Sequence, residues 1–413
     1  MKAMHLKGHV IDDIISIGDK RVILFPAGKY THMLLQFKRP ANIAYICDNN
    51  PDLHGTSIYG IPVVSPTQIT EETDDCCIIV TSNHLFRSIF EQISKLGVLN
   101  RCEFILCNWD YIRAASFYDP FTFEDRRKHF DKTLIILAGY KDKLWDIIFK
   151  RIERFVPDNI DVCVMSSGKY VDRLREICEN NDWSYLSTVT NNVSLIQNIA
   201  IELHPNAQFI YKLDEDMFIC EGFFEGLMDT YMDVEANSAY HVGLVAPVIP
   251  VNPHGAVRFM ELKGCLDEFE SRFGKAYYDF YSHFSTNLDE TLFLWEQSLP
   301  LDVVSKEFQK ATYSYYVCPH RFSIGAILFP RLVWEGMGGF KVRVGAGLGS
   351  DEYDFAEYFL SMVNFYTYII AENVLAGHYS FGRIINPEKL DEFYETNRGL
   401  FDILETDDLQ PES

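Results

Sequence analysis

Hydrophobic residues in the first part of the chain fall into short runs that are separated by helical patterns. The runs at 21–26, 42–47, 76–81 and 103–107 are typical of buried strands, while 29–37 and 84–96 carry helical spacing. Strands that alternate with helices predict a parallel, doubly wound sheet. We therefore expect a Rossmann-like domain over residues 1–110.

A second alternation of the same kind begins at residue 133. The runs at 134–138 and 161–165 predict strands, and 144–155 and 171–178 predict helices. A further helix, marked by Leu195, Ile199 and Leu203, leads into an apolar run that ends at Asp214. The pattern indicates a second α/β domain over 133–400, so the fold class is α/β with two Rossmann-like domains.

Three segments depart from this alternation. Residues 111–132 are polar and unpatterned, which is typical of a linker, and residues 401–413 form an acidic tail that we expect to be frayed. Residues 250–320 are dense in aromatic side chains and predict a substrate-facing insertion or a small helical subdomain. Its Trp295, Tyr313 and Tyr316 could stack on an acceptor sugar, although packing in the core is the commoner role of such rings.

Charge and composition exclude several classes of function. The chain has 413 residues, with 37 basic and 59 acidic side chains and a net charge of −22, which argues against a nucleic-acid partner. No run approaches the roughly 18 apolar residues of a membrane-spanning helix. The N-terminus carries acids where a signal peptide needs an apolar core, so we expect a cytoplasmic protein. The ten cysteines lack paired metal-ligand spacing, which favours buried free thiols in a reducing compartment.

Two carboxylates, Asp214 and Asp216, follow the apolar run that ends in the segment YKLDEDMFI. Ionised carboxylates at the edge of a core are costly unless positive charge meets them. Ligands of α/β sheets bind at the carboxyl ends of strands, and two acids on one turn can bind Mg²⁺ or Mn²⁺. The alternative is that both residues merely cap a turn.

Six segments, taken in order, carry a resemblance to a known family. They are LIILAGYKDKLWDIIFKRI, VCVMSSGKY, YKLDEDMFI, SIGAILFPRLVWEGMGGF, GSDEYDFAEYF and AGHYSFG. Together they resemble a GT-A glycosyltransferase of the nucleotide-sugar-dependent type related to family 2. The resemblance covers about 250 residues and identifies Asp214 and Asp216 with the DxD motif.

The resemblance implies a metal site at this motif. Asp216 would be a direct ligand of Mn²⁺ or Mg²⁺, Asp214 would contact the donor's ribose or the metal shell, and His378 would complete the site. A structural role for His378 is the alternative. The cation would stabilise the charge that grows on a diphosphate as the sugar leaves.

The resemblance also implies a catalytic base at the acids that open a helical pattern, Asp351 and Glu352. Family alignment favours Glu352 for an inverting enzyme, but this chain has Asp-Glu where the family usually has Glu-Asp, so Asp351 remains a rival. The base would take a proton from the acceptor hydroxyl. If the enzyme retains configuration, this assignment fails, and acids at a helix start are favoured electrostatically in any case.

The nucleotide would lie near two predicted turns and one helix. The turns contribute Ala138, Gly139, Tyr140 and Ser167, although the family's usual acid is missing from the second turn. The helix contributes Gln197 and Asn198, for which an exposed polar face is an equal alternative.

Residues near the N-terminus resemble the Rossmann-like sugar- or CoA-binding domain found ahead of some bacterial sugar-modifying enzymes. The segments are FPAGKYTHMLLQF and YICDNNPDLHGTSIYGIPVVSP. Gly28 is the only glycine left of a G-x-G-x-x-G pattern, which argues against redox dinucleotide binding. Asp48 lies where a ribose-binding acid would, so a regulatory nucleotide site and a purely structural domain both remain open.

The sequence therefore predicts a metal-dependent glycosyltransferase that uses a nucleotide-sugar donor, with UDP as the nucleotide. The acceptor would be a hydroxyl of a glycan or lipid-linked glycan in bacterial surface polysaccharide biosynthesis, by family analogy alone. The alternatives are a sugar-1-phosphate nucleotidyltransferase and a non-catalytic binding or scaffold protein. The pattern leaves the formation of a homo-oligomer open.

Overall fold

The structure, a computed structural model, describes residues 20–37, 40–72, 76–82, 85–98, 102–106, 121–253, 255–278, 287–311, 313–342, 350–359, 365–379 and 386–404. The chain forms two compact units, one of residues 1–121 with 338–347 and one of residues 122–337 with 348–413. Among the described residues, no helix is both long and apolar enough to cross a membrane.

The first unit is built on a sheet with helices between its strands. Its elements are β1 (Arg21–Phe25), α2 (Lys29–Phe37), β2 (Ile43–Cys47), η1 (Pro51–Leu53), β3 (Ser57–Ile58), β4 (Ile61–Val64), η2 (Pro66–Glu71), β5 (Cys76–Val80), α3 (Phe86–Lys95) and β6 (Cys102–Leu106). The sheet order is β3-β4-β2-β1-β5-β6, and every neighbouring pair except β3 and β4 is parallel. The five parallel strands follow the order of a doubly wound sheet, which confirms the predicted α/β class.

The carboxylate of Asp48, just after β2, accepts hydrogen bonds from the protein's own backbone. Its Oδ2 atom accepts a hydrogen bond from the Ala27 amide at 2.8 Å, and its Oδ1 atom accepts one from the Asn50 amide at 2.7 Å. The carboxylate therefore closes the turn between β1 and α2, which is a structural role.

The expectation that all cysteines are free is wrong for two of them. Cys76 and Cys102 lie opposite each other on the parallel strands β5 and β6 and form a disulfide. The other described cysteines are buried and free: Cys47, Cys77, Cys163, Cys178, Cys220, Cys265 and Cys318. Cys107 lies outside the described residues.

The second unit contains a ten-stranded sheet. Its strands are β7 (Phe121–Glu124), β8 (Lys132–Leu137), β9 (Asp161–Ser166), β10 (Ser184–Thr188), β11 (Phe209–Asp214), β12 (Met217–Ile219), β13 (His241–Val248), β14 (Tyr315–Cys318), β15 (Ala326–Pro330) and β16 (Tyr366–His378). The order is β12-β16-β13-β15-β11-β8-β9-β10-β7, with β14 paired to β16. Strands β8 to β11 are mutually parallel, and β15 is antiparallel to both β11 and β13.

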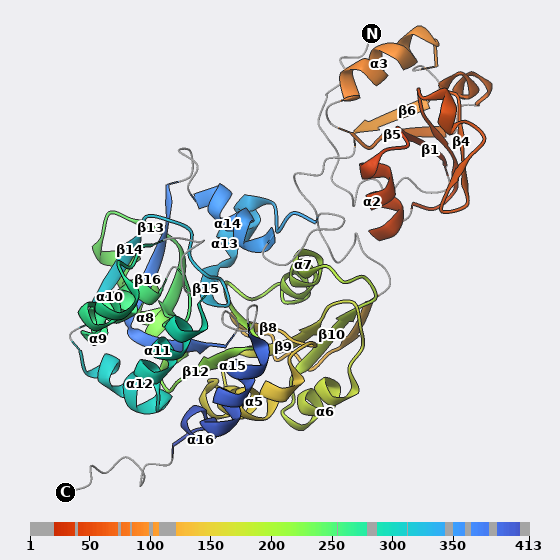
Figure 1. Ribbon diagram of the computed structural model, residues 1–413. Coiled ribbons are helices and arrows are strands. Elements are labelled where there is room, and N and C mark those ends of the chain that lie inside the picture. The colour runs from red at the N-terminus through yellow and green to blue at the C-terminus, as the bar shows by residue number, and fades with distance from the viewer. Residues whose placement is uncertain are drawn as a thin grey trace, which may run out of the picture. The chain divides into compact units, whose positions relative to one another are not determined.

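Helices cover both faces of this sheet (Figure 1). The described helical segments of the second unit are η4 (Asp142–Leu144), α5 (Trp145–Phe155), α6 (Asp172–Asn180), α7 (Val193–Leu203), α8 (Phe223–Asn237), α9 (Ala256–Lys263), α10 (Leu266–Phe273), α11 (Leu288–Ser298), α12 (Leu301–Lys310), α13 (Arg331–Met337), α14 (Ser350–Phe359), α15 (Pro387–Thr396) and α16 (Arg398–Phe401). Helix α7 packs on β8, β9 and β10 and also contacts α14, so residues 194–201 are buried all round. A helix that is apolar on every side lies inside the protein.

One of the predicted segment boundaries needs correction. The span assigned to a linker, 111–132, contains β7 from Phe121 onward, and β7 is a strand of the second unit's sheet; residues 107–120 lie outside the described part. Residues 250–320, for which a substrate-facing insertion and a small helical subdomain are the alternatives, contain α9 to α12 and the strand β14. Trp295 is 0% exposed and packs on Phe401 at 4.9 Å between ring centroids, so it belongs to the core and cannot stack on an acceptor, whereas Tyr313 is 42% exposed.

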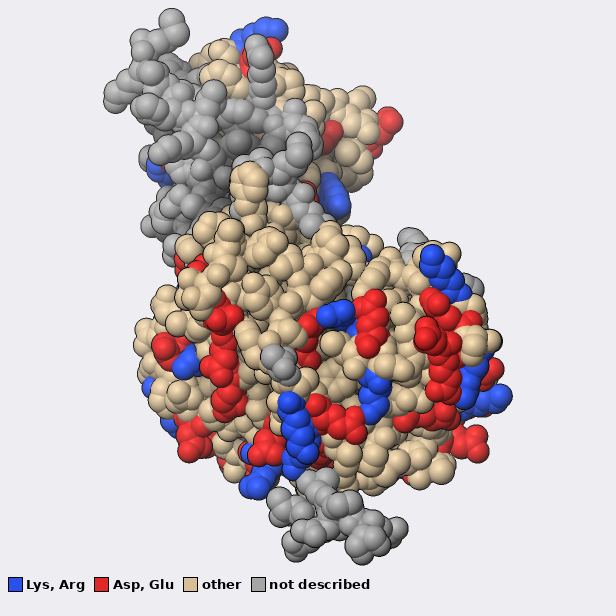
Figure 2. Space-filling model, turned by 90° about the vertical axis from the view of Figure 1, so that its left-hand side faces the viewer, with Lys and Arg blue, Asp and Glu red and all other residues tan. Residues whose placement is uncertain are grey.

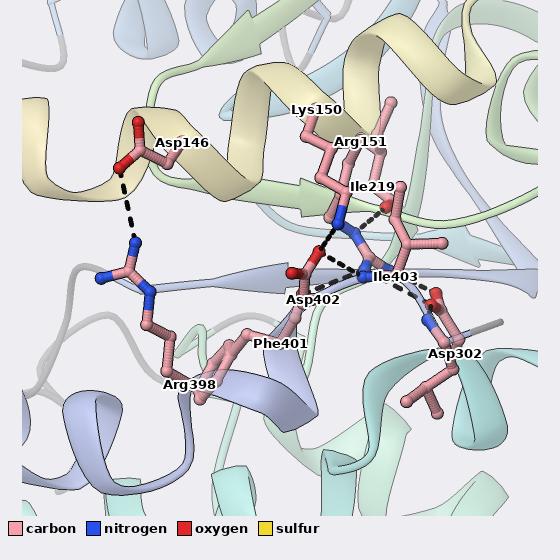
Figure 3. A network of polar contacts seen from close by, with 10 residues as sticks. Asp146, Lys150, Arg151, Ile219, Asp302, Arg398, Phe401, Asp402 and Ile403 are labelled. Carbon is pink, nitrogen blue, oxygen red and sulfur yellow. Dashed lines mark hydrogen bonds and ion pairs between the residues drawn. The ribbon is translucent and has the colours of Figure 1, made fainter. Parts of the chain in front are cut away.

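Residues 401–404 are packed against the rest of the second unit, so the first residues of the segment assigned to an acidic tail belong to the fold. Figure 3 shows its anchor, the guanidinium of Arg151, which donates to the main-chain carbonyls of Phe401 at 3.0 Å and Ile219 at 2.7 Å. Arg151 also forms a buried ion pair with Asp302, whose Oδ2 atom accepts the Leu404 amide at 3.1 Å. One buried charge pair thus ties α5, α12 and the end of the chain together.

Charged side chains of both signs are interspersed over the face of the second unit drawn in Figure 2. Lysine and arginine do not gather there into a broad basic surface. A phosphate on this face would therefore be met by a local arrangement of donors or by a cation.

Replacement of Arg151 by methionine should destabilise the second unit strongly. Arg151→Met leaves the Asp302 carboxylate buried without its cation, so we expect the free energy of unfolding to fall by about 3–5 kcal/mol. Lys150→Met is the matched control, because its pair with Asp402 at 2.8 Å is half exposed and should be worth less than about 1 kcal/mol. Urea unfolding followed by circular dichroism measures both, and equal losses in the two variants would contradict the assignment of Arg151 as the anchor.

Candidate functional site

The site lies at the point where the order of the parallel strands reverses. Strands β9 and β10 lie on one side of β8, and β11, which follows them in sequence, pairs with the other side. Ligands of open α/β sheets bind at such a switch point, outside the carboxyl ends of the strands. In the register of this sheet, Asp214 lies opposite Leu137, so the acidic turn and the turn after β8 begin side by side.

Glu215 joins these two turns. Its carboxylate accepts hydrogen bonds from the backbone amides of Gly139 at 2.8 Å and Tyr140 at 2.9 Å, and from the Trp145 indole nitrogen at 2.7 Å. The side chain is buried, and a buried carboxylate needs such donors. Glu215 therefore holds the turn after β8 in place, and the amides of Gly139 and Tyr140 are not available for a phosphate.

Asp216 meets a histidine from the far end of the chain. Strands β12 and β16 are antiparallel and place Met217 opposite His378, so the Nε2 atom of His378 lies 3.3 Å from Asp216 Oδ2. The ammonium of Lys141 forms an ion pair with the same oxygen. Burial alone would raise the pKa of Asp216, but His378 and Lys141 hold it well below its ordinary value.

Asp214 faces a different cation. The ammonium of Lys212, a residue of β11 that is almost fully buried, donates to Asp214 Oδ1 at 2.7 Å and to the Ile324 carbonyl at 2.9 Å. Burial raises the pKa of Asp214, and Lys212 opposes this shift. Burial would likewise lower the pKa of Lys212, but the charges of Asp214 and Asp351 raise it above its ordinary value.

The two acids at the start of α14 have different surroundings. Asp351 is 3% exposed, and its Oδ2 atom accepts a hydrogen bond from Gln197 Nε2 at 2.8 Å. Glu352 is only partly buried and accepts a hydrogen bond from Arg321 Nε at 2.6 Å. Burial raises the pKa of Glu352, an effect that Arg321 opposes and Asp351 reinforces. A carboxylate that is partly accessible and has a raised pKa suits a general base better than one that is sealed in the core.

The donor set fits a divalent cation at Asp216 and His378. Carboxylate and imidazole are ligands of Mn²⁺, and such ions commonly take one or two protein ligands with substrate phosphates at the other positions. In the described part of the chain, no three aspartate, glutamate, histidine or cysteine side chains form a group suited to a metal. The predicted ligand set is therefore reduced, because Asp214 is turned to Lys212 instead of joining Asp216 and His378.

Most of the residues predicted to contact the nucleotide are buried and bonded within the protein. Ala138 is 1% exposed, and Ser167 Oγ accepts the Asn192 amide at 2.7 Å. Gln197 and Asn198 are both 0% exposed, so the alternative of an exposed polar face is wrong. Asn198 accepts a hydrogen bond from the Trp334 indole at 2.9 Å, which makes it a link between α7 and α13.

Tyr140 is the exception among these residues. Its ring is 55% exposed, its hydroxyl donates to the Ser167 carbonyl at 2.7 Å, and the Lys169 ammonium lies 4.0 Å from the ring centroid. The ring therefore lies at the carboxyl ends of β8 and β9. The hydrogen bond to Ser167 and the contact with Lys169 fix its position, and more than half of the residue is exposed to solvent. It can stack on a planar ligand such as a nucleobase.

Four residues of the site were not singled out from the sequence: Glu215, Lys141, Lys212 and Arg321. A signal existed for Lys212, because a lysine inside an apolar strand predicts a buried partner of opposite charge. Glu215 stands between the two aspartates. Its position in the sequence does not show whether its carboxylate is buried and joins two turns or is exposed to solvent. The partners of Lys141 and Arg321 are 75 and 31 residues away, so no local pattern could have revealed them.

A cavity of about 970 Å³ lies elsewhere in the second unit, lined by residues that include Lys150, Cys220, Ser305 and Leu404. None of the site residues named above lines it. We therefore identify the site from its charged groups and from the topology of the sheet, and not from this cavity.

Comparison with known proteins gives only distant likenesses. No protein-family model matches the sequence, and no curated protein matches it. One similar solved structure is the mannosyltransferase PcManGT from Pyrobaculum calidifontis in complex with GDP-Man and Mn²⁺, with 17% identity, a TM-score of 0.34 and coverage of 63% of this chain and 60% of that chain. A second is GalNAc-T7 with UDP, GalNAc and Mn²⁺, with 10% identity, a TM-score of 0.37 and coverage of 79% and 61%. A third is a mycobacterial protein, with 11% identity, a TM-score of 0.33 and coverage of 61% and 68%. Because these TM-scores are low, we infer function from the geometry of the site.

Replacement of Glu215 by glutamine should loosen the turn after β8. An amide nitrogen would then face one of the N–H donors that the carboxylate accepts, so we expect the free energy of unfolding to fall by about 1–3 kcal/mol. Trp145 should report the change as a shift in its fluorescence. Glu221→Gln, an exposed position just after β12, is the control and should stay within about 0.5 kcal/mol of the unmodified protein. A Glu215→Gln protein with unchanged stability would contradict the conclusion that Glu215 holds the turn after β8 in place.

Proposed function

We propose that the second unit is a glycosyltransferase that depends on a divalent cation and uses a nucleoside diphosphate sugar as its donor. One observation carries the proposal: Asp216 and His378 meet at the strand-end turn after β11, and Asp214 on the same turn lies within electrostatic range of both Asp216 and the α14 acid Asp351. A cation anchor and a candidate base that lie near each other at a strand-end site are what transfer from a diphosphate leaving group requires.

Asp216 and His378 would hold Mn²⁺ or Mg²⁺. When bound, the cation supplies positive charge to the diphosphate as the sugar leaves. Lys212 donates to Asp214 and holds its carboxylate in position, so that Asp214 would border the ribose or the outer shell of the metal. The exposed ring of Tyr140 would stack on the nucleobase of the donor. UDP is the nucleotide that we propose on the basis of the family resemblance.

Glu352 would act as the general base. It must take a proton from the acceptor hydroxyl while that oxygen attacks the anomeric carbon, and its raised pKa favours this role. Asp351, bonded to Gln197 and buried, would hold the start of α14 against α7. This assignment refers to an inverting transfer.

The acceptor would be a hydroxyl of a glycan or a lipid-linked glycan in surface polysaccharide biosynthesis. This finer part of the proposal rests on the family resemblance alone. The first unit, with a doubly wound strand order and Asp48 committed to its own turn, would serve as a structural or binding domain beside the transferase.

Removal of the Asp216 carboxylate should abolish cation-dependent nucleotide binding. In a thermal-shift screen of UDP-sugars, GDP-sugars and nucleoside triphosphates with and without Mn²⁺, we expect a nucleotide sugar with Mn²⁺ to raise the melting temperature. Asp216→Ala should lose that rise, whereas Asp229→Asn, at an exposed acid of α8, should keep it. An Mn²⁺-dependent rise that survives in Asp216→Ala would contradict the metal assignment. A response to triphosphates alone would favour a nucleotidyltransferase, and no response at all would favour a non-catalytic scaffold.

Glu352→Gln should lower turnover without loss of donor binding. A glutamine keeps the shape of the side chain but cannot accept the proton, so we expect kcat to fall by about 10²–10⁴. Glu357→Gln, an exposed acid on the same helix, should leave kcat unchanged. The measurement is donor consumption in the presence of acceptor, together with calorimetry of donor binding. A greater fall for Asp351→Asn, with Glu352→Gln near the unmodified rate, would move the base to Asp351.

A further inference from the structure

Lys141 occupies the position at which a cation would meet Asp216. Its ammonium forms an ion pair with Asp216 Oδ2, the same oxygen that lies 3.3 Å from His378 Nε2. Asp216 is 1% exposed, whereas the side chain of Lys141 is 27% exposed. The carboxylate is thus fixed in the protein, while the lysine reaches it from the side of the solvent.

The backbone beside Lys141 is held firmly. The two preceding residues, Gly139 and Tyr140, donate their amides to Glu215, and Glu215 precedes Asp216 directly. The turn after β8 therefore cannot drift away from the acidic turn, and only the flexible stem of Lys141 is left to move. Lysine suits such a role, since its ammonium is a point charge on a chain of four rotatable carbons.

A divalent cation and the Lys141 ammonium cannot share one carboxylate oxygen at close range, because like charges in a desolvated site repel strongly. A cation that binds Asp216 and His378 must displace Lys141. The displaced ammonium then needs a new anion, and a donor diphosphate lying on the cation brings negative oxygens to the same place.

We propose that Lys141 is an exchangeable counter-ion that makes cation binding depend on the donor. This inference rests on the proposed function. Without donor, Lys141 neutralises Asp216 and opposes the entry of a free cation. With donor, the ammonium moves to the diphosphate, so that cation and nucleotide bind together more strongly than either binds alone. The sequential neighbour Lys143 has no such role, because it forms an ion pair with Asp391 and lies over the ring of Tyr379.

The test compares Lys141→Met with Lys143→Met, which removes the same charge two residues away. Titration calorimetry measures the affinity for Mn²⁺ alone, and then the affinity for UDP and for GDP in saturating Mn²⁺. We expect Lys141→Met to bind Mn²⁺ alone about tenfold more tightly and to bind the nucleoside diphosphate about tenfold more weakly. Lys143→Met should match the unmodified protein in both measurements. Lys141→Gln, which keeps a hydrogen-bond donor but no charge, should behave as Lys141→Met does and serves in its place if that variant does not unfold cooperatively.

Unchanged Mn²⁺ affinity in both Lys141 variants would overturn the competition with the cation. Tighter Mn²⁺ binding with unchanged nucleotide affinity would overturn the transfer of the ammonium to the diphosphate. Either result leaves the proposed function standing if Asp216→Ala still loses Mn²⁺ binding. Absence of Mn²⁺ binding from the unmodified protein and from every variant would overturn this inference and the cation dependence of the proposed function together.

Discussion

The carboxylate of Glu215, with its three N–H donors, is the interaction on which the site depends. It joins the turn after β8 to the turn after β11, and these strands are neighbours only because the strand order reverses between them. The bonds to Gly139 and Tyr140 occupy both amides, which are then unavailable to a phosphate. For the donor diphosphate that we propose, positive charge would therefore come from side chains or from a cation.

The second feature of the site is the pairing of its buried acids with positive charge. Lys212 lies among Asp214, Asp351 and Glu352, and each of these acids contributes to the raised pKa of its ammonium. In a medium of low dielectric constant, unpaired carboxylates would take up protons or open the structure to water. In a chain with a net charge of −22, the buried cation Lys212 is thus placed where several acids meet. Arg321 serves Glu352 in the same way at the accessible edge.

The remainder of the second unit supports the site at a distance. The pair of Arg151 and Asp302 fastens α5 to α12 and to the segment that ends at Leu404, and α5 follows directly on the turn that carries Lys141. At the other end of the site, Gln197 connects the buried helix α7 to the first acid of α14. Helices that are far apart in sequence are therefore linked by polar contacts. The hydrophobic periodicity of the sequence does not predict these contacts.

The sequence by itself determined the class of the fold, because strand and helix periods differ and the alternation of apolar runs located β1, β2, β5, β8 and β9 to within two residues, and the end of β11. It also placed Asp214 and Asp216 at a strand end. It did not show the disulfide between Cys76 and Cys102, the strand at Phe121 or the packed segment at Phe401, since each depends on a partner far along the chain. The family resemblance implied that His378 lies near Asp216, and the pairing of β12 with β16 sets the distance between them. Tertiary structure alone decided that Asp216 also meets Lys141 while Asp214 meets Lys212, because the register of β8 with β11 brings the two turns side by side.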